Sequence, residues 1–498
     1  MASGPRTEIR LRSRTLKNNF IAGEWVGSEE AIENINPSDT RDIIDVFSSA
    51  STADVGRAID AASTALPAWS ISSPLKRFEA LDAIGTEIIA RQQELGDYLA
   101  REEGKTLDEA IAEAARAGHL FKFFAAEAYR SNSDGYISLR ENVGLSVHRE
   151  ALGVVGVITP WNFPLAIPAW KIAPALAYGN TVVFKPAELV SGSAWLMTEI
   201  ISRAGLPDGV FNLVMGRGSV VGQEIVSSSR VAGVTFTGST PIGKSIGSVV
   251  FRRGGRVQLE MGGKNPLIVC GDADIDVAVD CALKGSFFST GQRCTASSRL
   301  IVEESIHDEF VDKLVNRMST LCIGDARSPE TDIGPVASEA QLDVDLKYLK
   351  IGDNEGACRR FGGDLVQSDK PGHYLFPALF TETTNSMRIN REEIFGPVAA
   401  VIRVSNFDEA IDVANDADVG LSAGVVTTSS AKVKEFVRRI EAGMAQANLP
   451  TAGMDFHAPF TGRKNSSFGP PEKGSYCREF FTHAKVVHEA QLPTANVV

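Results

Sequence analysis

The stretch Gly153-Val-Val-Gly-Val-Ile-Thr-Pro-Trp-Asn-Phe-Pro164 has the pattern that determines the fold class. A short apolar strand, Val154 to Ile158, runs into a proline-rich turn, and an apolar helix is predicted from about Ala166 to Ala177. The alternation continues, with strands predicted at 181–184, 210–214 and 233–236 and a helix at 193–204. Strands and helices that alternate at this spacing are typical of a parallel sheet with helices on both faces.

A second series of the same kind begins at Leu267. It consists of a strand at 267–270, a helix at 275–288 and a strand at 299–302. Before residue 152 the apolar periodicity predicts three helices, at 52–66, 74–100 and 107–126. No internal repeat is found. We therefore expect two α/β lobes in one chain of 498 residues.

Two segments do not fit either lobe. Residues 136–150 resemble a hairpin with a turn near 141–144, and residues 480–488 resemble a lone strand. Unpaired strand edges promote aggregation, so we expect these segments to pair with each other or with another subunit. The chain is therefore predicted to form an oligomer.

Composition excludes several classes of function. The net charge of −12, from 62 acidic and 50 basic residues, argues against a broad nucleic-acid-binding face. The six cysteines form no CxxC pair, which favours a reduced, cytoplasmic location. No histidine spacing suggests a metal site, and no apolar run is long enough to span a membrane. The N-terminal arginines, at positions 6, 10, 12 and 14, are interpreted as part of a tail and not as a targeting signal.

Cys294 is the first candidate for chemistry. It lies in the polar stretch Thr290-Gly-Gln-Arg-Cys-Thr-Ala-Ser-Ser298, between a predicted helix and a predicted strand. A thiol is a strong nucleophile once its pKa is lowered, and Arg293 beside it is expected to help. The alternative is an inert small residue, and the residues alone leave the two interpretations about equal.

Glu260 is the second candidate. It ends the predicted strand Val257-Gln-Leu-Glu260 and precedes Gly262 and Gly263. α/β enzymes place general bases at such strand ends. A surface carboxylate or a helix cap is the alternative, and it is favoured if the residue is considered alone.

Two further turns are candidates for cofactor binding. Phe236-Thr-Gly-Ser-Thr-Pro-Ile-Gly243 combines a strand, a glycine turn and a helix start, where backbone N–H groups can hold a pyrophosphate. Lys185-Pro-Ala-Glu188 follows a strand and can hold ribose hydroxyls. The first lacks the GxGxxG pattern and the second is equally typical of a solvated turn, so each is weak alone.

Taken together, these motifs show a resemblance. Over nearly its whole length the chain resembles the aldehyde dehydrogenase superfamily, whose motifs occur here in order and at the usual spacing. They are Thr159-Pro-Trp-Asn-Phe-Pro164, Phe184-Lys-Pro-Ala-Glu188, Phe236-Thr-Gly-Ser239, Leu259-Glu-Met-Gly-Gly263, Gly291-Gln-Arg-Cys294 and Glu393-Ile-Phe-Gly-Pro397.

The resemblance implies a two-lobed fold. It has a Rossmann-like cofactor lobe (1–131 and 152–262), an α/β catalytic lobe (263–462) and a small bridging β element for oligomerisation (132–151 and 463–498). The resemblance implies that this element builds a homodimer or homotetramer. The implied catalytic residues are Cys294 as nucleophile, Asn162 for the oxyanion, Glu260 as the base for water, and Lys185. The implied cofactor is NAD, with NADP possible. Its implied contacts are Thr159, Pro160, Trp161, Lys185, Glu188, Gly218, Gly222, Gly238, Ser239, Ile242, Gly262, Glu393 and Phe395.

Within the superfamily the chain is most similar to the α-ketoglutarate semialdehyde (2,5-dioxopentanoate) dehydrogenases. The similar segments are 167–174, 287–299 and 448–453, whereas Thr461, Asn465 and Pro471 depart from that subgroup's usual residues. The small-molecule partner implied is an aldehyde with a distal carboxylate. The candidate substrate contacts are Phe163, Trp170, Phe288, Arg293, Ser298, Phe456 and His457.

Several alternatives stay open. Succinate semialdehyde dehydrogenases place an arginine where Trp170 stands, which argues against that substrate, while an aromatic lining would suit apolar or aromatic aldehydes. A cofactor-free cysteine hydrolase needs a histidine that the motifs lack. A CoA-acylating enzyme would not need Glu260, and a non-catalytic structural member would not need Cys294, Glu260 and Asn162 together.

Overall fold

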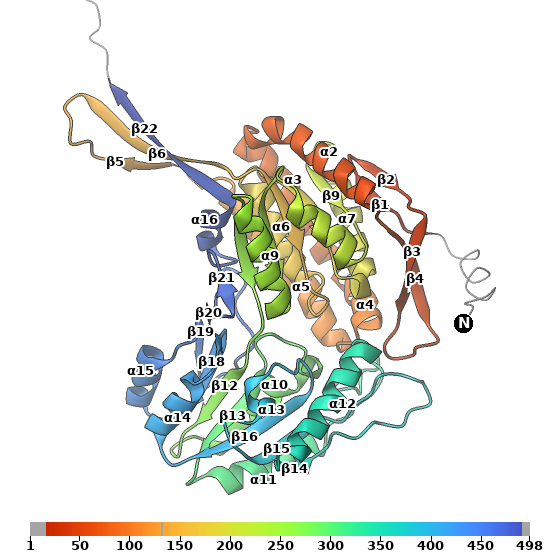
Figure 1. Cartoon of the computed structure of the whole chain (residues 1–498), viewed down its shortest axis with the longest axis vertical. Coiled ribbons are helices and arrows are strands. Elements are labelled where there is room, and N and C mark those ends of the chain that lie inside the picture. Colours follow the sequence, from red (N-terminus) through yellow and green to blue (C-terminus); the bar gives the residue numbers. More distant parts are fainter. Residues whose placement is uncertain (1–15, 131–132, 491–498) are drawn as a thin grey trace, which may run out of the picture.

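The computed structural model describes residues 16–130 and 133–490, which form two α/β lobes and a projecting arm (Figure 1). The N-terminal arginines lie outside the described residues. The two-lobed α/β prediction is confirmed by the two large sheets. Within the described ranges no helix has the length and apolarity needed to cross a membrane, and no cluster of three His, Cys, Asp or Glu side chains suits a metal ion.

The upper lobe contains a mixed sheet with a parallel centre. In spatial order its strands are β2 (Glu24–Val26), β1 (Asn19–Ile21), β9 (Phe211–Leu213), β8 (Thr181–Lys185), β7 (Val154–Ile158), β10 (Val231–Thr237), β11 (Arg256–Glu260) and β21 (Ser467–Phe468). The strands from β9 to β11 are parallel, and β1, β2 and β21 extend the edges in antiparallel pairing.

Helices cover both faces of this sheet. One face packs against α2 (Thr52–Ser70), α8 (Gln223–Ser227) and α9 (Thr240–Arg252), and the other against α3 (Pro74–Ala90), α5 (Leu107–Glu127), α6 (Ala166–Ala177) and α7 (Ser191–Ser202). In β7, Val154 and Ile158 face the first group, whereas Val155 and Val157 face the second. This alternation explains why every residue of the strand is apolar or glycine.

One predicted helix is wrong in its length. The segment 74–100 forms two helices, α3 and α4 (Gln92–Glu103), because the chain leaves helical geometry at Arg91 (φ −101°, ψ 14°). The Arg91 guanidinium binds Glu87, Glu94 and Glu199, which stabilises the bend. The bend lets α4 approach α5 closely.

The lower lobe contains the second sheet. Its order is β14 (Cys358–Phe361), β15 (Ala378–Thr383), β16 (Val398–Val404), β13 (Ser297–Glu303), β12 (Asn265–Val269), β18 (Ser422–Val426) and β19 (Met444–Ala447). All neighbours are parallel except β14 and β15. The helices around it are α10 (Ile275–Ser286), α11 (His307–Met318), α12 (Glu339–Asn354), α13 (Arg388–Arg391), α14 (Phe407–Asn415) and α15 (Ser430–Arg439).

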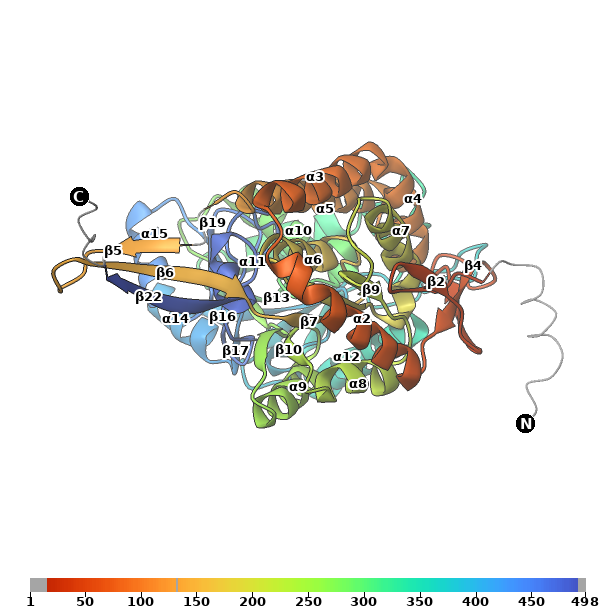
Figure 2. The ribbon, with the colours of Figure 1, turned by 90° about the horizontal axis from the view of Figure 1, so that it is seen from above.

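The arm is a three-stranded sheet that leaves the body of the molecule, as the view from above makes clear (Figure 2). Its order is β22 (Thr482–Ala490), β6 (Val143–Ala151) and β5 (Ser133–Tyr136). The prediction that the hairpin and the C-terminal strand pair with each other is confirmed by nine antiparallel residue pairs between β6 and β22. Phe480, predicted to start that strand, belongs to the short helix α16 (Arg478–Phe481) instead.

The remaining short strands connect these parts. β3 (Glu30–Ile35) pairs with β4 (Ile43–Ser49) at the side of the upper lobe. β20 (Arg463–Lys464) pairs with β17 (Val419–Gly420) of the lower lobe, while β21 joins the upper sheet. Residues 463–468 therefore contact both lobes and lie away from the arm. The division into cofactor, catalytic and bridging domains stays a prediction.

Candidate active site

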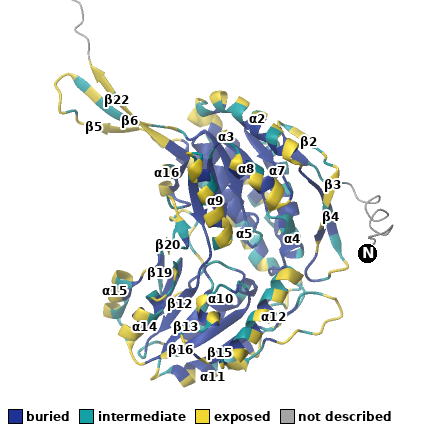
Figure 3. Cartoon of the chain, in the orientation of Figure 1, coloured by how far each residue is buried: buried dark blue, intermediate teal, exposed yellow. Residues whose placement is uncertain are grey.

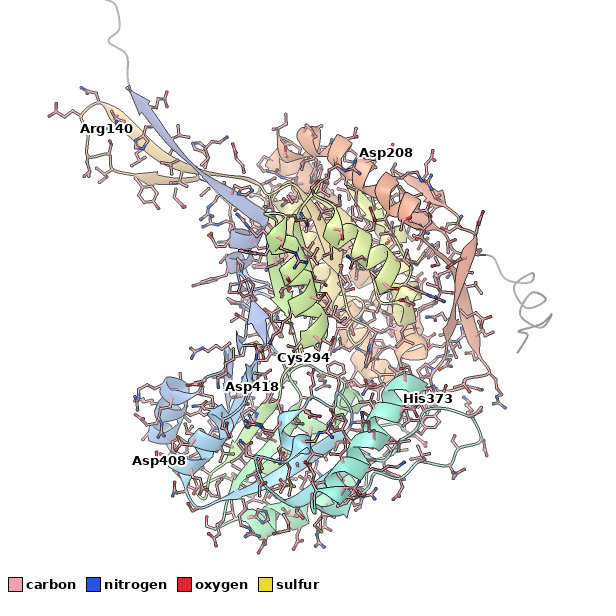
Figure 4. The ribbon with its side chains drawn as sticks, in the orientation of Figure 1. Arg140, Asp208, Cys294, His373, Asp408 and Asp418 are labelled. Carbon is pink, nitrogen blue, oxygen red and sulfur yellow. The ribbon has the colours of Figure 1, made fainter. Side chains whose placement is uncertain are left out.

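Cys294 lies where the two lobes meet, at the inner end of a short loop (Figure 4). The loop follows α10, and Ser289 (φ 52°), Thr290 (φ 56°) and Gly291 (φ 66°) adopt left-handed backbone conformations in succession. For residues other than glycine this costs of the order of 1–3 kcal/mol each. Ser289 Oγ donates to Glu109 Oε1 at 2.8 Å, and Thr290 Oγ1 donates to Gly334 O at 3.1 Å. The upper lobe, through Glu109, and the lower-lobe loop at Gly334 thus hold the strained turn before the cysteine.

Cys294 faces a cavity of about 200 Å³. Of the predicted substrate contacts, Phe163, Trp170 and Arg293 line it. The lining also includes Phe460, whose ring centroid is 5.6 Å from that of Trp170. The structure therefore places the thiol at the wall of a pocket that combines aromatic and charged side chains.

The other four predicted substrate contacts do not line this cavity. Phe288 packs against the apolar core of the lower lobe, and Ser298 lines a separate small cavity with Glu393 and Phe395. Phe456 stacks on His119, with centroids 5.7 Å apart, and His457 is exposed beside it. Their nearness in sequence to the motifs did not predict which way these side chains point.

The expected effect of Arg293 on Cys294 is wrong. Burial, together with the nearby Glu393 and Glu260, raises the pKa of Cys294 to about 12. The Arg293 guanidinium donates instead to Glu109 at 2.7 Å and to Ser289 Oγ at 2.8 Å, so its charge is already paired. Cys294 in this environment needs a base to remove its proton.

Asn162 lies against the cysteine loop. Its side-chain Nδ2 donates to Gln292 O at 2.8 Å, and its own carbonyl accepts from Lys105 Nζ at 2.6 Å. Asn265, which was not predicted, donates from Nδ2 to Cys294 O at 2.8 Å. Its position directly after the Gly-Gly-Lys turn was the only available signal. An amide has two N–H donors, so Asn162 keeps one for an oxyanion.

Glu260 is buried at the end of β11. Its Oε2 accepts from Ser467 Oγ at 2.5 Å, and burial together with nearby Glu472 raises its pKa well above the usual range. Glu472, also not predicted, accepts from Trp170 Nε1 at 2.6 Å and forms an ion pair with Lys171. Two buried carboxylates beside one lysine favour a shared proton.

The predicted cofactor residues gather at the carboxyl ends of the upper strands. Glu188 Oε1 accepts from Gly218 N at 3.2 Å, and Lys185 donates to Pro186 O at 2.6 Å. Burial lowers the pKa of Lys185 to about 8. Gly222 lies beside the Lys185 side chain, close enough that an added Cβ would be 3.7 Å from it. These residues form one continuous rim.

The rim has groups suited to a dinucleotide. The hydroxyls of Thr159 and Thr237 are buried without a hydrogen-bond partner among the described residues. The N-terminus of α9 has no side-chain cap from Ser239, and Gly238 and Ile242 flank it, so its backbone N–H groups are free for a phosphate. Unsatisfied donors beside an uncapped helix of 13 residues fit the predicted pyrophosphate.

The opposite side of this site comes from the lower lobe. Glu393 accepts from Gly263 N at 2.9 Å, and a Cβ on Gly262 would lie 2.1 Å from its carboxylate, so a side chain there would displace Glu393. Burial raises the pKa of Glu393 to about 7. The Phe395 ring meets Trp161 edge-on at 5.4 Å, next to Pro160. Both lobes therefore contribute to a single site.

Comparison with known proteins agrees with this geometry. The model of the family described as "Aldehyde dehydrogenase family" matches residues 25–487. The chain belongs to the aldehyde dehydrogenase family. It is an NAD(P)-dependent enzyme that oxidises an aldehyde, and the resemblance found in the sequence is confirmed.

Named relatives cover nearly the whole chain. An alpha-ketoglutaric semialdehyde dehydrogenase of Bacillus subtilis is 43% identical, covering 94% of this chain and 97% of the relative. A 2,5-dioxopentanoate dehydrogenase of Saccharolobus solfataricus is 40% identical, covering 94% and 98%. A betaine aldehyde dehydrogenase of Staphylococcus aureus, solved with NAD⁺, superimposes with a TM-score of 0.93 at 32% identity, covering 98% of each chain. This match confirms the predicted aldehyde dehydrogenase fold.

Proposed function

We propose that this enzyme oxidises α-ketoglutarate semialdehyde to α-ketoglutarate with NAD⁺, through a thioester on Cys294. Relatives from a bacterium and an archaeon, at 43% and 40% identity, bear that activity in their names. The main structural support is the position of Cys294 in a cavity of about 200 Å³, which suits a short aldehyde.

In the proposed mechanism the Cys294 sulfur bonds to the aldehyde carbon, and the carbonyl oxygen becomes an oxyanion. The free N–H of the Asn162 amide and the Cys294 backbone N–H are proposed to stabilise it. Bound NAD⁺ supplies the hydride acceptor. Loss of hydride from the carbon restores the carbonyl and leaves a thioester on Cys294.

Glu260 is proposed to act as the base. Burial and Glu472 raise its pKa well above the usual range, which makes its carboxylate a stronger base toward the proton of the thiol or of the attacking water. Water then adds to the thioester carbon, and the carbon–sulfur bond breaks to release the acid and the thiol. Glu260 accepts a hydrogen bond from Ser467 Oγ and does not line the cavity, so we propose that its side chain rotates toward the sulfur to act.

The cofactor contacts are proposed from the rim described above. Lys185 and Glu188 would bind the adenosine ribose, Ser239 the pyrophosphate, and Glu393 the nicotinamide ribose. We propose that NAD⁺ is preferred over NADP⁺, because the Gly218 N–H holds the Glu188 carboxylate where a 2′-phosphate would meet like charge. A higher kcat/KM with NADP⁺ than with NAD⁺ would contradict this preference.

We also propose that the enzyme is a cytoplasmic homo-oligomer. All six cysteines are free thiols, as expected in a reduced compartment. The apolar tip of the arm supports assembly with further copies of the chain.

The substrate proposal is tested by comparing kcat/KM for α-ketoglutarate semialdehyde, succinate semialdehyde, benzaldehyde and hexanal. We expect α-ketoglutarate semialdehyde to give the highest value. If an uncharged aldehyde is preferred by about tenfold, equivalent to ~1.4 kcal/mol of transition-state binding, the proposed substrate is wrong.

A further inference from the structure

The aldehyde cavity is lined by two acidic and three basic side chains, and both acidic ones are already paired. Glu109 forms an ion pair with Arg293 at 2.7 Å. Glu113 forms one with the buried Lys105 at 2.5 Å, and it also accepts from the backbone N–H of Leu165 at 2.9 Å. Neither carboxylate is therefore available to neutralise another cation at the cavity wall.

Lys473 is the first of the two remaining cations. Its side chain is buried, and within residues 16–130 and 133–490 no carboxylate forms an ion pair with it. Its ammonium donates to Asp455 O at 3.2 Å and lies 5.2 Å from the ring centroid of Trp170 and 5.1 Å from that of Phe460. An ammonium has three donors, so an anion in the cavity can accept the others.

Among the described residues, Arg116 is the second cation at the cavity wall without a paired carboxylate. It lies on α5, where residues spaced three and four apart, 109, 112, 113 and 116, line the cavity from one helix face. In the part of the chain that the structure describes, Arg116 forms no ion pair or hydrogen bond. Arg116 is close enough to contribute to the lowered pKa of Lys473, which burial mainly causes and which is about 8.

Two unpaired cations that repel each other across one cavity are stabilised when an anion binds between them. The aromatic rings of Phe163, Trp170 and Phe460 contribute apolar surface, which suits a methylene chain. The thiol of Cys294 lies in the same cavity and contributes to the electrostatic environment of Lys473. A short aldehyde with a carboxylate at its far end matches this arrangement, whereas a cationic aldehyde such as betaine aldehyde meets like charge.

We propose that Lys473 and Arg116 bind the distal carboxylate of the substrate and determine the preference for an acidic aldehyde. This assignment rests on the proposed function and adds the residues responsible. Neither residue belongs to the six motifs, and Lys473 directly follows Glu472, the carboxylate that binds Trp170 and Lys171.

The test compares Lys473→Met, Arg116→Met and Lys473→Arg with the wild-type enzyme. For each, kcat and KM are measured with α-ketoglutarate semialdehyde, succinate semialdehyde and hexanal. We expect each methionine variant to lower kcat/KM for the two acidic aldehydes by about tenfold to a hundredfold, mainly through KM, because a charged hydrogen bond is lost. Hexanal should change by less than about threefold. Lys473→Arg should retain most of the preference for acidic aldehydes.

Lys122→Met is the matched control, because Lys122 lies on the same helix but binds Asp82 outside the cavity. It should leave all three substrates unchanged. Equal losses on hexanal and on the acidic aldehydes, or no loss at all, would overturn the assignment. Arg116 is exposed, so its variant tests the proposal even if Lys473→Met fails to fold.

The two proposals fail in different ways. A wild-type enzyme that prefers hexanal over both acidic aldehydes contradicts the proposed function and, with it, this assignment. A wild-type preference for acidic aldehydes that survives both methionine substitutions contradicts only the roles of Lys473 and Arg116.

Discussion

Cys294 and Glu260 are both buried where their charged forms are disfavoured. Burial and neighbouring carboxylates raise the pKa of the thiol to about 12 and that of Glu260 well above its usual range. A thiolate beside an ionised carboxylate would bring two negative charges together in a poorly solvated site. We therefore expect the two residues to exchange one proton, with a separate effect when each is replaced.

Glu260→Gln should separate the two halves of the reaction. The variant should release about one equivalent of NADH per active site in a slower burst, because the Cys294 thiol has lost its proton acceptor. Turnover should then fall by about a hundredfold or more, because the thioester accumulates without a base for the attacking water. Stopped-flow absorbance and mass spectrometry of the acylated Cys294 measure both effects. The control, Cys294→Ala, should give neither burst nor turnover while still binding NAD⁺. Unchanged steady turnover by Glu260→Gln would rule out the assigned role.

If Lys473 binds the distal carboxylate, substrate preference should depend on pH. The lysine is charged below its pKa of about 8 and neutral above it. Its titratable neighbours include Arg116, Glu472, Cys294 and Asp455. The ratio of kcat/KM for α-ketoglutarate semialdehyde to that for hexanal should therefore be constant below about pH 7 and fall through pH 9. Taking the ratio cancels the ionisation of Cys294 and Glu260, which both substrates share. If the wild-type ratio stays flat with pH but is lower in Lys473→Met, the lysine binds the carboxylate and its pKa is not near 8. If the ratio rises with pH, the charge of Lys473 does not favour the acidic aldehyde.

Helix α5 connects packing to the active site. One face presents Glu109, Glu113 and Arg116 to the cavity, while Gly118 on another face packs directly against α3. A Cβ on Gly118 would lie 2.5 Å from Ile89 Cγ1 and 3.0 Å from Gly85 O. The helices approach at this distance only because both crossing residues are glycines. The burial pattern agrees, because α5 is buried along the face that packs against its neighbours and exposed on the other (Figure 3).

Gly118→Ala should destabilise the protein by about 1–3 kcal/mol through overpacking, despite the better helix propensity of alanine. Gly56→Ala on α2 is the matched control, because an added Cβ there meets nothing within 4 Å. That control should be neutral or stabilising by about 0.4–1 kcal/mol. Thermal denaturation of the two variants measures the contrast. Equal melting temperatures would show that the α3–α5 contact relaxes without cost.

At the scale of the whole molecule, the active site lies between the two lobes and the arm projects away from both. The cavity needs α5 and α6 from the upper lobe and the Cys294 loop from the lower lobe, so neither lobe alone forms the site. At the arm's turn, Ile137 is 94% exposed and Leu139 is fully exposed. In the homo-oligomer that we propose, another subunit would cover these exposed apolar residues.

Ile137→Ser combined with Leu139→Ser should therefore weaken assembly without unfolding the lobes. Sedimentation velocity should show a smaller species than the wild type at equal concentration. Ile71→Ser, at an 84% exposed apolar residue on the body, is the control and should assemble normally. If the double variant sediments as the wild type does, the tip is not part of the interface.

The local pattern of apolar residues was enough to predict many of the helices and strands of this protein. Strand β7 and helix α6 begin and end where the apolar periodicity predicts, because side chains on one strand or helix report directly on burial. Local pattern alone left Cys294 and Glu260 undecided. The resemblance carried by the motif turns indicated these two residues and Asn162, and their roles stay predictions. The bend at Arg91 was not predictable, since its carboxylate partner Glu199 is distant in the chain.

The charges around the aldehyde were decided only by the tertiary structure. Lys171 and Glu472 are 301 residues apart, and Arg116 and Lys473 reach one cavity from α5 and from the C-terminal segment. Arg293, adjacent to Cys294 in sequence, is neutralised by Glu109 on another helix. A residue's neighbours in the chain indicate its secondary structure and which face of that element is buried. Whether its charge is paired or left free for a substrate depends on groups that only folding brings within a few ångströms.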